Sequence, residues 1–346
     1  MSHVRRLAHL AAHLGAGDAP GSGHEDSKAS TTSGEEAGPS LAAAATAAAS
    51  TGRGGSGSDW HQQCFAFEPG RLLLGQVAIV TGAGGGIGRA AAILFAHQGA
   101  HVVVSDLDAD KAQATVDFIL NSSGSAISVP GDVTDPCFPA RLVQAAVDKF
   151  GMLNILVNNA GFTWDGMAHK MSEKQWQAML DVHCTAPFRL VQAAAPHMRE
   201  AAKREMEAGR RPRPRCVLNV SSVSGVHGSV GQLNYSTAKA GVVGFTKSLA
   251  REWGPFGIRV NCLTYGYINT RLVQSKDRGA TIEVAGERVQ LGIPQADGAA
   301  AAMKQLIALG RVGAPEEAAG AMLLLASPYA SYVTGQSLEV TGGGWL

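Results

Sequence analysis

From about residue 71 to its end, the chain alternates short, continuously apolar runs with longer segments that repeat apolar residues at helical spacing. Short apolar runs of this kind predict strands that are covered on both faces, and their alternation with helices predicts parallel pairing through right-handed crossovers. The sequence therefore predicts an α/β fold with one doubly wound parallel sheet of about seven strands and helices on both faces. The expected strands span 76–82, 101–106, 126–132, 153–159, 215–222, 258–266 and 337–343. The expected helices span 87–98, 109–121, 136–150, 172–199, 234–253 and 315–327.

The N-terminal part of the chain differs from the rest in composition. With 346 residues and 45% hydrophobic content, the chain can build one large core. Residues 15–59, however, are mainly Gly, Ala, Ser and Thr, so they bury too little apolar surface to offset the entropy of ordering them. We therefore expect a disordered leader at 1–59 and a single folded domain at 60–346.

The first residues of this leader resemble an organellar presequence. Val4 and Leu7 begin an apolar helical stripe, Arg5 and Arg6 lie outside it, and no acidic residue occurs before Asp18. A secretory apolar core is absent, so the pattern indicates a mitochondrial address more than a secretory one. Plastid and cytoplasmic locations remain open, since an incidental basic tail would have the same composition.

Charge and cysteine usage exclude several classes of partner. The formal net charge is +1, which gives no electrostatic basis for binding nucleic acid or an anionic membrane surface. The five cysteines are far apart and form no CxxC pair, so we expect neither a disulfide framework nor a metal site.

Two segments interrupt the regular alternation and are interpreted as insertions. Residues 199–215 continue a charged helix into a basic loop broken by prolines, which is typical of a solvated surface segment. The alternative interpretation is a site for an acidic partner. Residues 271–309 form a longer connection than two neighbouring elements need, and they contain a predicted small hairpin around Ala285 and Gly286. Long excursions beyond the carboxyl ends of parallel strands are common places for ligand lids.

A glycine-rich turn, TGAGGGIG at residues 81–88, joins the first strand to the first helix. It does not fit G-x-G-x-x-G but does fit TGxxxGxG, with Gly82, Gly86 and Gly88 at the glycine positions. Glycines let the backbone turn sharply and approach a pyrophosphate, and the next helix presents free N–H groups and its positive dipole end. The strand, turn and helix together predict a Rossmann-type dinucleotide site. Its candidate residues here are Thr81, Gly82, Gly84, Gly86, Ile87 and Gly88.

Asp106 ends the second strand at the distance from the glycine turn where an acid can bind the adenosine ribose. A carboxylate at this point repels a 2′-phosphate, and Gly84 and Gly85 add no basic side chain. We therefore expect NAD, with NADP less favoured. The alternative interpretation is a strand-ending Asp that only begins a turn with Asp108.

Four motifs in order carry a resemblance to the short-chain dehydrogenase/reductase family: the glycine turn, NNAG at 158–161, NVSS at 219–222, and a Tyr and a Lys four residues apart. The resemblance extends from about Leu74 to the C-terminus. The segment GQLNYSTAKAGVVGFTKSLAREW is most similar to 3-oxoacyl-acyl-carrier-protein reductases and related 3-hydroxyacyl dehydrogenases. By this resemblance, further residues adjoin the cofactor or support it: Asp132, Val133, Asn158, Ala160, Gly161, Tyr235, Lys239, Gly266, Ile268 and Thr270.

The catalytic group implied by the residues and the resemblance centres on Tyr235 and Lys239, one helical turn apart. An ammonium beside a phenol, together with the positive ring of an oxidised nicotinamide, is expected to stabilise phenolate and lower the pKa of Tyr235. Tyr235 is then the acid in reduction and the base in oxidation. The family pattern places Ser222 on the reacting oxygen. Its neighbour Ser221 is expected on the opposite face of the strand.

Two positions depart from the family pattern. His183 stands where the family usually has an Asn that holds a water leading from the lysine to solvent. We expect His183 either to replace that Asn in a proton relay or to be a packed histidine without such a role. Tyr265 precedes Gly266 where the family commonly has Pro-Gly, and this weakens any narrow assignment of substrate.

The leading hypothesis is an NAD-dependent oxidoreductase that interconverts a ketone and a secondary alcohol, with a 3-oxoacyl or 3-hydroxyacyl thioester as substrate. Other carbonyl substrates (steroids, sugars or quinones) and a catalytically weak NAD-binding scaffold are the alternatives. By family resemblance, we also expect a homotetramer.

Overall fold

The computed structural model describes residues 70–284, 286–292 and 305–344. The predicted leader and presequence at 1–59 lie outside these residues. Within the described part of the chain, no helix is long and apolar enough to cross a bilayer.

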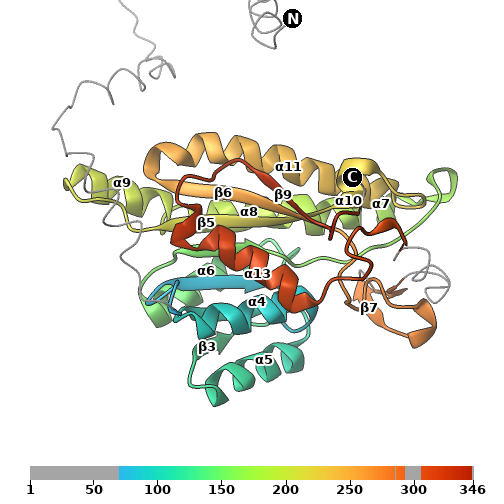
Figure 1. Ribbon diagram of the computed structural model, residues 1–346, viewed down its shortest axis with the longest axis horizontal. Coiled ribbons are helices and arrows are strands. Elements are labelled where there is room, and N and C mark those ends of the chain that lie inside the picture. The colour runs from blue at the N-terminus through green and yellow to red at the C-terminus, as the bar shows by residue number, and fades with distance from the viewer. Residues whose placement is uncertain (1–69, 285, 293–304, 345–346) are drawn as a thin grey trace, which may run out of the picture. The chain divides into compact units, whose positions relative to one another are not determined.

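Seven parallel strands form one sheet in the order β3-β2-β1-β4-β5-β6-β9, which confirms the predicted fold class (Figure 1). The order reverses between β1 and β4, and ligands bind at such a switch point, outside the carboxyl ends of the strands. The strands are β1 (Val77–Thr81), β2 (His101–Ser105), β3 (Ser125–Ser128), β4 (Ile155–Asn158), β5 (Arg215–Ser222), β6 (Ile258–Tyr265) and β9 (Ser337–Val340).

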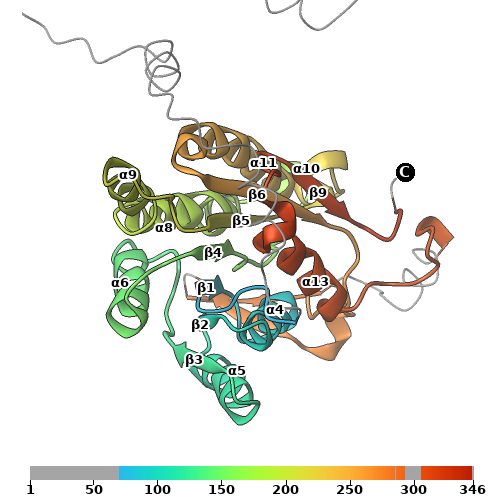
Figure 2. The same cartoon turned by 60° about the vertical axis from the view of Figure 1, so that its left-hand side comes forward.

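Helices cover both faces of the sheet. The helices α4 (Gly86–His97), α5 (Ala109–Asn121) and α13 (Pro315–Ala326) bury their apolar residues in one core cluster. The opposite cluster includes α6 (Phe138–Phe150), α8 (Ala186–Ala194) and α11 (Leu233–Trp253). In Figure 2, α6 and α8 lie on one side of the strands, and α4 and α13 lie on the other.

The prediction of one continuous helix at 172–199 is wrong, because the structure divides this segment into several helical elements. It consists of α7 (Glu173–Leu180), a π-helical turn (Asp181–Thr185) and α8, followed by α9 (Arg199–Glu207). Pro187 has no N–H to donate to the carbonyl of His183, so the α-helical ladder cannot continue across this turn. Pro196 has the same effect at the end of α8. The π turn carries His183, whose placement is described below.

The basic segment at 199–215 is fixed at both ends. After α9, the chain returns through an irregular loop to Arg215, the first residue of β5. Buried Arg215 forms an ion pair with Glu205 at 2.8 Å, and hydrogen bonds from Arg215 lower the pKa of Glu205 to about 2. This segment lies at the amino end of β5, whereas the predicted site lies at the carboxyl ends of the strands.

The small hairpin predicted within 271–309 is confirmed. Strands β7 (Thr281–Val284) and β8 (Glu287–Gln290) pair antiparallel, with Val284 opposite Glu287. Gly286 has φ +78°, a conformation that glycine adopts without steric cost. Leu291, directly after β8, is fully buried in the second core cluster, so the hairpin is anchored to the domain.

Candidate active site

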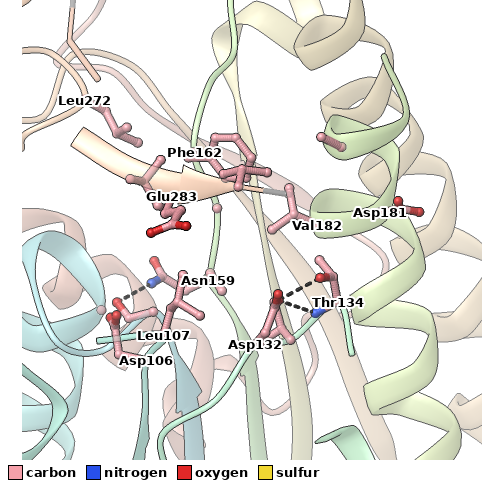
Figure 3. A pocket seen from close by; sticks show the side chains of 18 of the residues that line it. Asp106, Leu107, Asp132, Thr134, Asn159, Phe162, Asp181, Val182, Leu272 and Glu283 are labelled. Atoms are coloured by element: carbon pink, nitrogen blue, oxygen red, sulfur yellow. Dashed lines mark hydrogen bonds between the residues drawn. The ribbon is translucent and has the colours of Figure 1, made fainter. Parts of the chain in front are cut away.

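Two adjoining cavities open at the carboxyl ends of the central strands. The larger has a volume of about 870 Å³ and lies beside the glycine turn and Asp106 (Figure 3). The smaller, of about 350 Å³, contains Tyr235 and Lys239. Ile87, Gly161 and Thr270 line both cavities, so the two form a continuous site.

The glycine turn needs glycine for steric reasons. Gly82 and Gly86 have φ of +63° and +53°, in the left-handed region that side chains disfavour. A Cβ added to Gly88 would lie 2.2 Å from the carbonyl oxygen of Gly82 and 2.5 Å from Nδ2 of Asn159. The turn and α4 can approach each other only without this side chain.

The start of α4 fits a dinucleotide pyrophosphate. The first turn of the helix holds no acidic residue, and no side chain among the described residues caps it. Gly85, Gly86 and Ile87 line the larger cavity, and a Cβ on Gly85 would meet nothing within 4 Å. Unpaired N–H groups and the positive end of the helix dipole therefore face space that can hold an anion.

Asp106 lies on the wall of the larger cavity beside the glycine turn and is held by backbone groups. Its Oδ2 accepts a hydrogen bond from the Gly84 N–H at 2.8 Å, and its Oδ1 accepts one from the Asp108 N–H at 3.1 Å. The nearby Lys111 forms an ion pair with Asp108. Asp106 thus ties the second strand to the glycine turn and also presents a carboxylate to the cavity.

The structure places most of the predicted cofactor residues on the cavity walls. The larger cavity is lined by Gly82, Gly86, Ile87, Gly88, Asp106, Asp132, Val133, Ala160, Gly161 and Thr270. The smaller is lined by Tyr235, Lys239, Gly266 and Ile268, with Ile87, Gly161 and Thr270 shared.

Three predicted residues, Thr81, Gly84 and Asn158, do not line either cavity and support it from behind. The Thr81 hydroxyl accepts hydrogen bonds from the N–H groups of Asn159 and Ala160, each at 3.0 Å. Gly84 holds Asp106, and its own Cβ would lie 2.9 Å from that carboxyl group. These residues shape the wall from a second layer.

A buried polar ladder fixes α11 against the sheet. Asn158 donates to Asn219 Oδ1 at 2.8 Å, and Asn219 donates to the Thr246 hydroxyl at 2.9 Å. The three side chains join β4, β5 and α11, so they set the position of the helix that carries Tyr235. The position of α11 against the sheet therefore depends on side chains that line neither cavity.

Ser222, Tyr235 and Lys239 meet at the smaller cavity. A hydrogen bond between Ser222 and Tyr235 acts to lower the pKa of the phenol. Ser221 has a different environment, since its hydroxyl donates to the Lys239 carbonyl at 2.7 Å. The Lys239 Nζ donates to the Val220 carbonyl at 2.8 Å.

The protein by itself does not lower the pKa of Tyr235, contrary to the expectation from its neighbouring lysine. Burial raises the pKa of Tyr235 to about 12, and this effect outweighs the hydrogen bond from Ser222. Lys239 Nζ lies 5.6 Å from the centre of the phenol ring and is directed to a backbone carbonyl. Burial likewise lowers the pKa of Lys239 to about 8. The protein alone therefore keeps the phenol protonated at neutral pH.

The buried ammonium gives a stability prediction for Lys239→Met. The folded-state pKa of about 8 lies below the ordinary value of 10.5, so the folded protein disfavours the charged lysine near neutral pH. Between these values the unfolded chain binds more protons, and the stability of the wild type rises with pH. We expect the variant to gain about 1 to 3 kcal/mol in free energy of unfolding near neutral pH. Urea unfolding of both proteins measures the gain, which must shrink as the pH rises from 8 toward 10.5; a gain that is constant with pH would contradict the argument.

His183 is a buried, neutral side chain in contact with the catalytic tyrosine. It is 2% exposed, and burial is the main reason that its pKa lies well below 6.5. Its Nε2 lies 2.9 Å from the Phe162 carbonyl, which makes Nε2 the donor, and its ring meets Tyr235 edge to face at 5.1 Å. Its Nδ1 is a buried acceptor with no hydrogen-bond partner among the described residues.

The ring of His183 also explains why Gly161 is a glycine. A Cβ on Gly161 would lie 2.3 Å from Cε1 of the imidazole. The π turn pushes the ring into the space that this glycine leaves free.

Tyr265 points its hydroxyl away from the reaction centre. The hydroxyl donates to the Ala318 carbonyl at 2.8 Å, and burial raises the pKa of Tyr265. Its ring belongs to the core between the sheet and α13 while also reaching the wall of the smaller cavity. The residue therefore shapes the cavity with carbon atoms and offers it no polar group.

Sequence reasoning missed several cavity residues, among them Asn159, Phe162, Leu272 and Glu283. Asn159, the second Asn of NNAG, donates from Nδ2 to the Thr81 carbonyl at 2.8 Å and so supports the glycine turn. The Ala285-Gly286 turn signalled a hairpin but gave no sign that the hairpin lies against this cavity.

Comparisons with known proteins identify the family of this chain. A family model described as enoyl-(acyl carrier protein) reductase matches residues 82–344. The chain is 38% identical over 275 residues to a 3-oxoacyl-[acyl-carrier-protein] reductase of Vibrio cholerae, covering 79% of this chain and 99% of the relative. It is 35% identical to the 3-oxoacyl-[acyl-carrier-protein] reductase of Thermotoga maritima, covering 78% of this chain and 98% of the relative. It is 34% identical to the enzyme of the same name from Escherichia coli, covering 79% of this chain and 98% of the relative. The protein therefore belongs to the short-chain dehydrogenase/reductase family, oxidoreductases that act on CH–OH and C=O groups.

Proposed function

We propose that this protein is an NAD-dependent reductase of 3-oxoacyl thioesters, and that Ser222, Tyr235 and Lys239 are its catalytic residues. The observation that carries the proposal is their convergence in a cavity continuous with the one at the glycine turn. The substrate class follows from the 3-oxoacyl-[acyl-carrier-protein] reductases to which the chain is similar over nearly their full length.

A reduced nicotinamide coenzyme, held at the glycine turn and Asp106, would supply the hydride for this reaction. As negative charge develops on the ketone oxygen, Tyr235 donates its proton to that oxygen, for which a protonated phenol is suited. Ser222 orients the same oxygen and donates a hydrogen bond that strengthens as the charge grows. Lys239 places a positive charge beside the phenol when the phenolate forms, and so favours the proton transfer.

The choice of NAD rests on Asp106. Its carboxylate lies on the cavity wall at the end of β2, where it can accept hydrogen bonds from ribose hydroxyls. Lys111, in the first turn of α5 after β2, is already paired with Asp108. A 2′-phosphate beside Asp106 would therefore meet a carboxylate, and Lys111 would not offset the repulsion.

The test is a substrate panel read by coenzyme absorbance. Acetoacetyl thioester is offered with NADH and with NADPH, beside a steroid, a sugar and a quinone ketone. We expect turnover of the thioester with NADH. Saturable NADH binding without turnover of any ketone would favour a scaffold, and preference for another ketone would replace the substrate class.

His183 is proposed to take part in moving the proton from solvent to Lys239. Its neutral ring leaves Nδ1 as a buried acceptor, and the charge of Lys239 influences its pKa, so the two groups are close. We expect His183→Asn to lower kcat by no more than about 100-fold, the lower end for a positioned proton-transfer group, and to shift its pH profile. A variant with the wild-type rate and pH profile would reduce His183 to a packing residue.

Assembly and location are also proposed. The outward face of α11 presents small residues, including Ala240, Gly241 and Gly244, beside Phe245 and exposed Phe188. Close helix packing across this face suits a homotetramer, which light scattering of the purified protein would test. A mitochondrial location rests on the basic amphipathic N-terminus, and a fusion of residues 1–59 to a fluorescent protein would test it.

A further inference from the structure

The hairpin β7–β8 forms a wall of the larger cavity, across from the glycine turn. Ile282, Glu283 and Val284 line this cavity together with Gly82 and Asp106. The hairpin is held in place, because Lys174 of α7 forms an ion pair with Glu287 of β8 at 2.5 Å. The wall is thus built by a segment that lies far along the chain from the dinucleotide motif.

Glu283 directs its carboxylate into the cavity. In Figure 3 its side chain extends from β7 toward Asn159, on the side of the cavity where Asp106 and Leu107 lie. Glu283 has no hydrogen-bond or ion-pair partner among the residues that the structure describes. Arg288 stands opposite Glu283 in the β7–β8 ladder, but no ion pair joins these two side chains, so the carboxylate keeps its charge at this wall.

The charges around the cavity favour one form of the coenzyme. Five carboxylates line it, those of Asp106, Asp132, Glu173, Asp181 and Glu283, against two cations, Lys174 and Arg271. Lys174 is already paired with Glu287. Like charges in a cleft with low-dielectric walls repel more strongly than in open solvent. The carboxylates outnumber the cations even with Arg271 counted, so the binding of a coenzyme with an additional phosphate is weakened by more than the charge of Asp106 alone.

We propose that Glu283 is a second determinant of coenzyme choice, whose carboxylate acts with that of Asp106 to reject the 2′-phosphate of NADP(H). This inference rests on the proposed use of a nicotinamide coenzyme and adds to it a residue from the hairpin. Because the two carboxylates come from opposite walls, each acts on the phosphate without replacing the other. Glu283 needs no direct hydrogen bond to the coenzyme for this role, only its charge.

The test compares dissociation constants for NADH and NADPH, measured by fluorescence titration of the full chain. We expect Glu283→Gln to bind NADPH about 3- to 10-fold more tightly, with the NADH constant changed less than about twofold. The gain must fall at high salt, since screening weakens the charge effect. Glu252→Gln is the matched control: it removes one exposed carboxylate from α11 that lines neither cavity, so the ratio of the two constants should stay at the wild-type value.

The outcomes separate this inference from the proposed function. An unchanged ratio in Glu283→Gln, or equal weakening of both coenzymes by Glu283→Gln, would overturn the inference and leave the hairpin as steric cover. The same change of ratio in Glu252→Gln would overturn it as well. Weaker NADH binding alone would show that Glu283 instead binds a ribose hydroxyl. A wild type that prefers NADPH contradicts the proposed NAD dependence, while a salt-sensitive change of ratio in Glu283→Gln would still support the role of Glu283. A wild type that binds neither coenzyme would overturn both.

Discussion

Replacing Tyr235 with phenylalanine lowers kcat for thioester reduction by about 10²- to 10⁴-fold, the range that a positioned proton donor contributes. The variant loses only the hydroxyl that meets Ser222, whereas the partly buried ring and its contact with His183 remain. NADH binding and the thermal midpoint should therefore stay near the wild-type values. Stopped-flow measurement of NADH oxidation, beside a fluorescence titration, separates the chemical step from binding.

Tyr265→Phe is the matched control for this result. Its hydroxyl is bonded to the Ala318 carbonyl and faces away from the reaction centre. Removing it leaves that carbonyl without its donor and costs about 1 kcal/mol of stability, while most of the activity is retained. If Tyr235→Phe reduced the thioester as fast as the wild type, the assignment of Tyr235 as proton donor would fail.

Gly88→Ala is expected to damage both folding and coenzyme binding. The new Cβ would lie 2.2 Å from the Gly82 carbonyl oxygen, a backbone atom that cannot rotate away. Separating the turn from α4 should cost about 1 to 3 kcal/mol in free energy of unfolding. Displaced N–H groups should raise the Kd for NADH by about tenfold or more, since about 1.4 kcal/mol of lost binding energy is tenfold.

Gly320→Ala provides the control for a glycine that the fold does not require. Gly320 is an exposed residue within α13, and a Cβ there would meet nothing within 4 Å. Alanine should stabilise this helix by about 0.5 to 1 kcal/mol and leave the Kd for NADH unchanged. Urea unfolding of both variants, with NADH titration, makes the comparison. Wild-type stability and wild-type affinity in Gly88→Ala would contradict the close approach of the turn and the helix.

The seven strands and the glycine turn could be predicted because their signals are local. A continuously apolar run such as 77–80 predicts a strand buried on both faces wherever it lies in the sheet. The spacing of Gly82, Gly86 and Gly88 likewise describes one turn and the helix that follows it. Tyr235 and Lys239 needed only helical periodicity to be placed on one face.

The helix at 172–199 shows where local signals were insufficient. Apolar spacing continued across the segment, but Pro187 removed a hydrogen bond and a π turn formed. That turn placed the ring of His183 against Gly161, more than twenty residues away along the chain. A clash between residues so far apart leaves no trace in either local pattern.

The residues themselves specified which groups this protein could use: a glycine turn for a pyrophosphate, an acid at the end of the second strand, and a phenol one helical turn from an ammonium. Three-dimensional packing set how those groups behave. Burial, which depends on every neighbour, raised the pKa of Tyr235 where its adjacent lysine had suggested a fall. Folding of the β7–β8 hairpin against the cavity also brought the carboxylate of Glu283 into the cavity that Asp106 lines. Desolvation and long-range charge are sums over the folded surroundings, and no spacing along the chain encodes them.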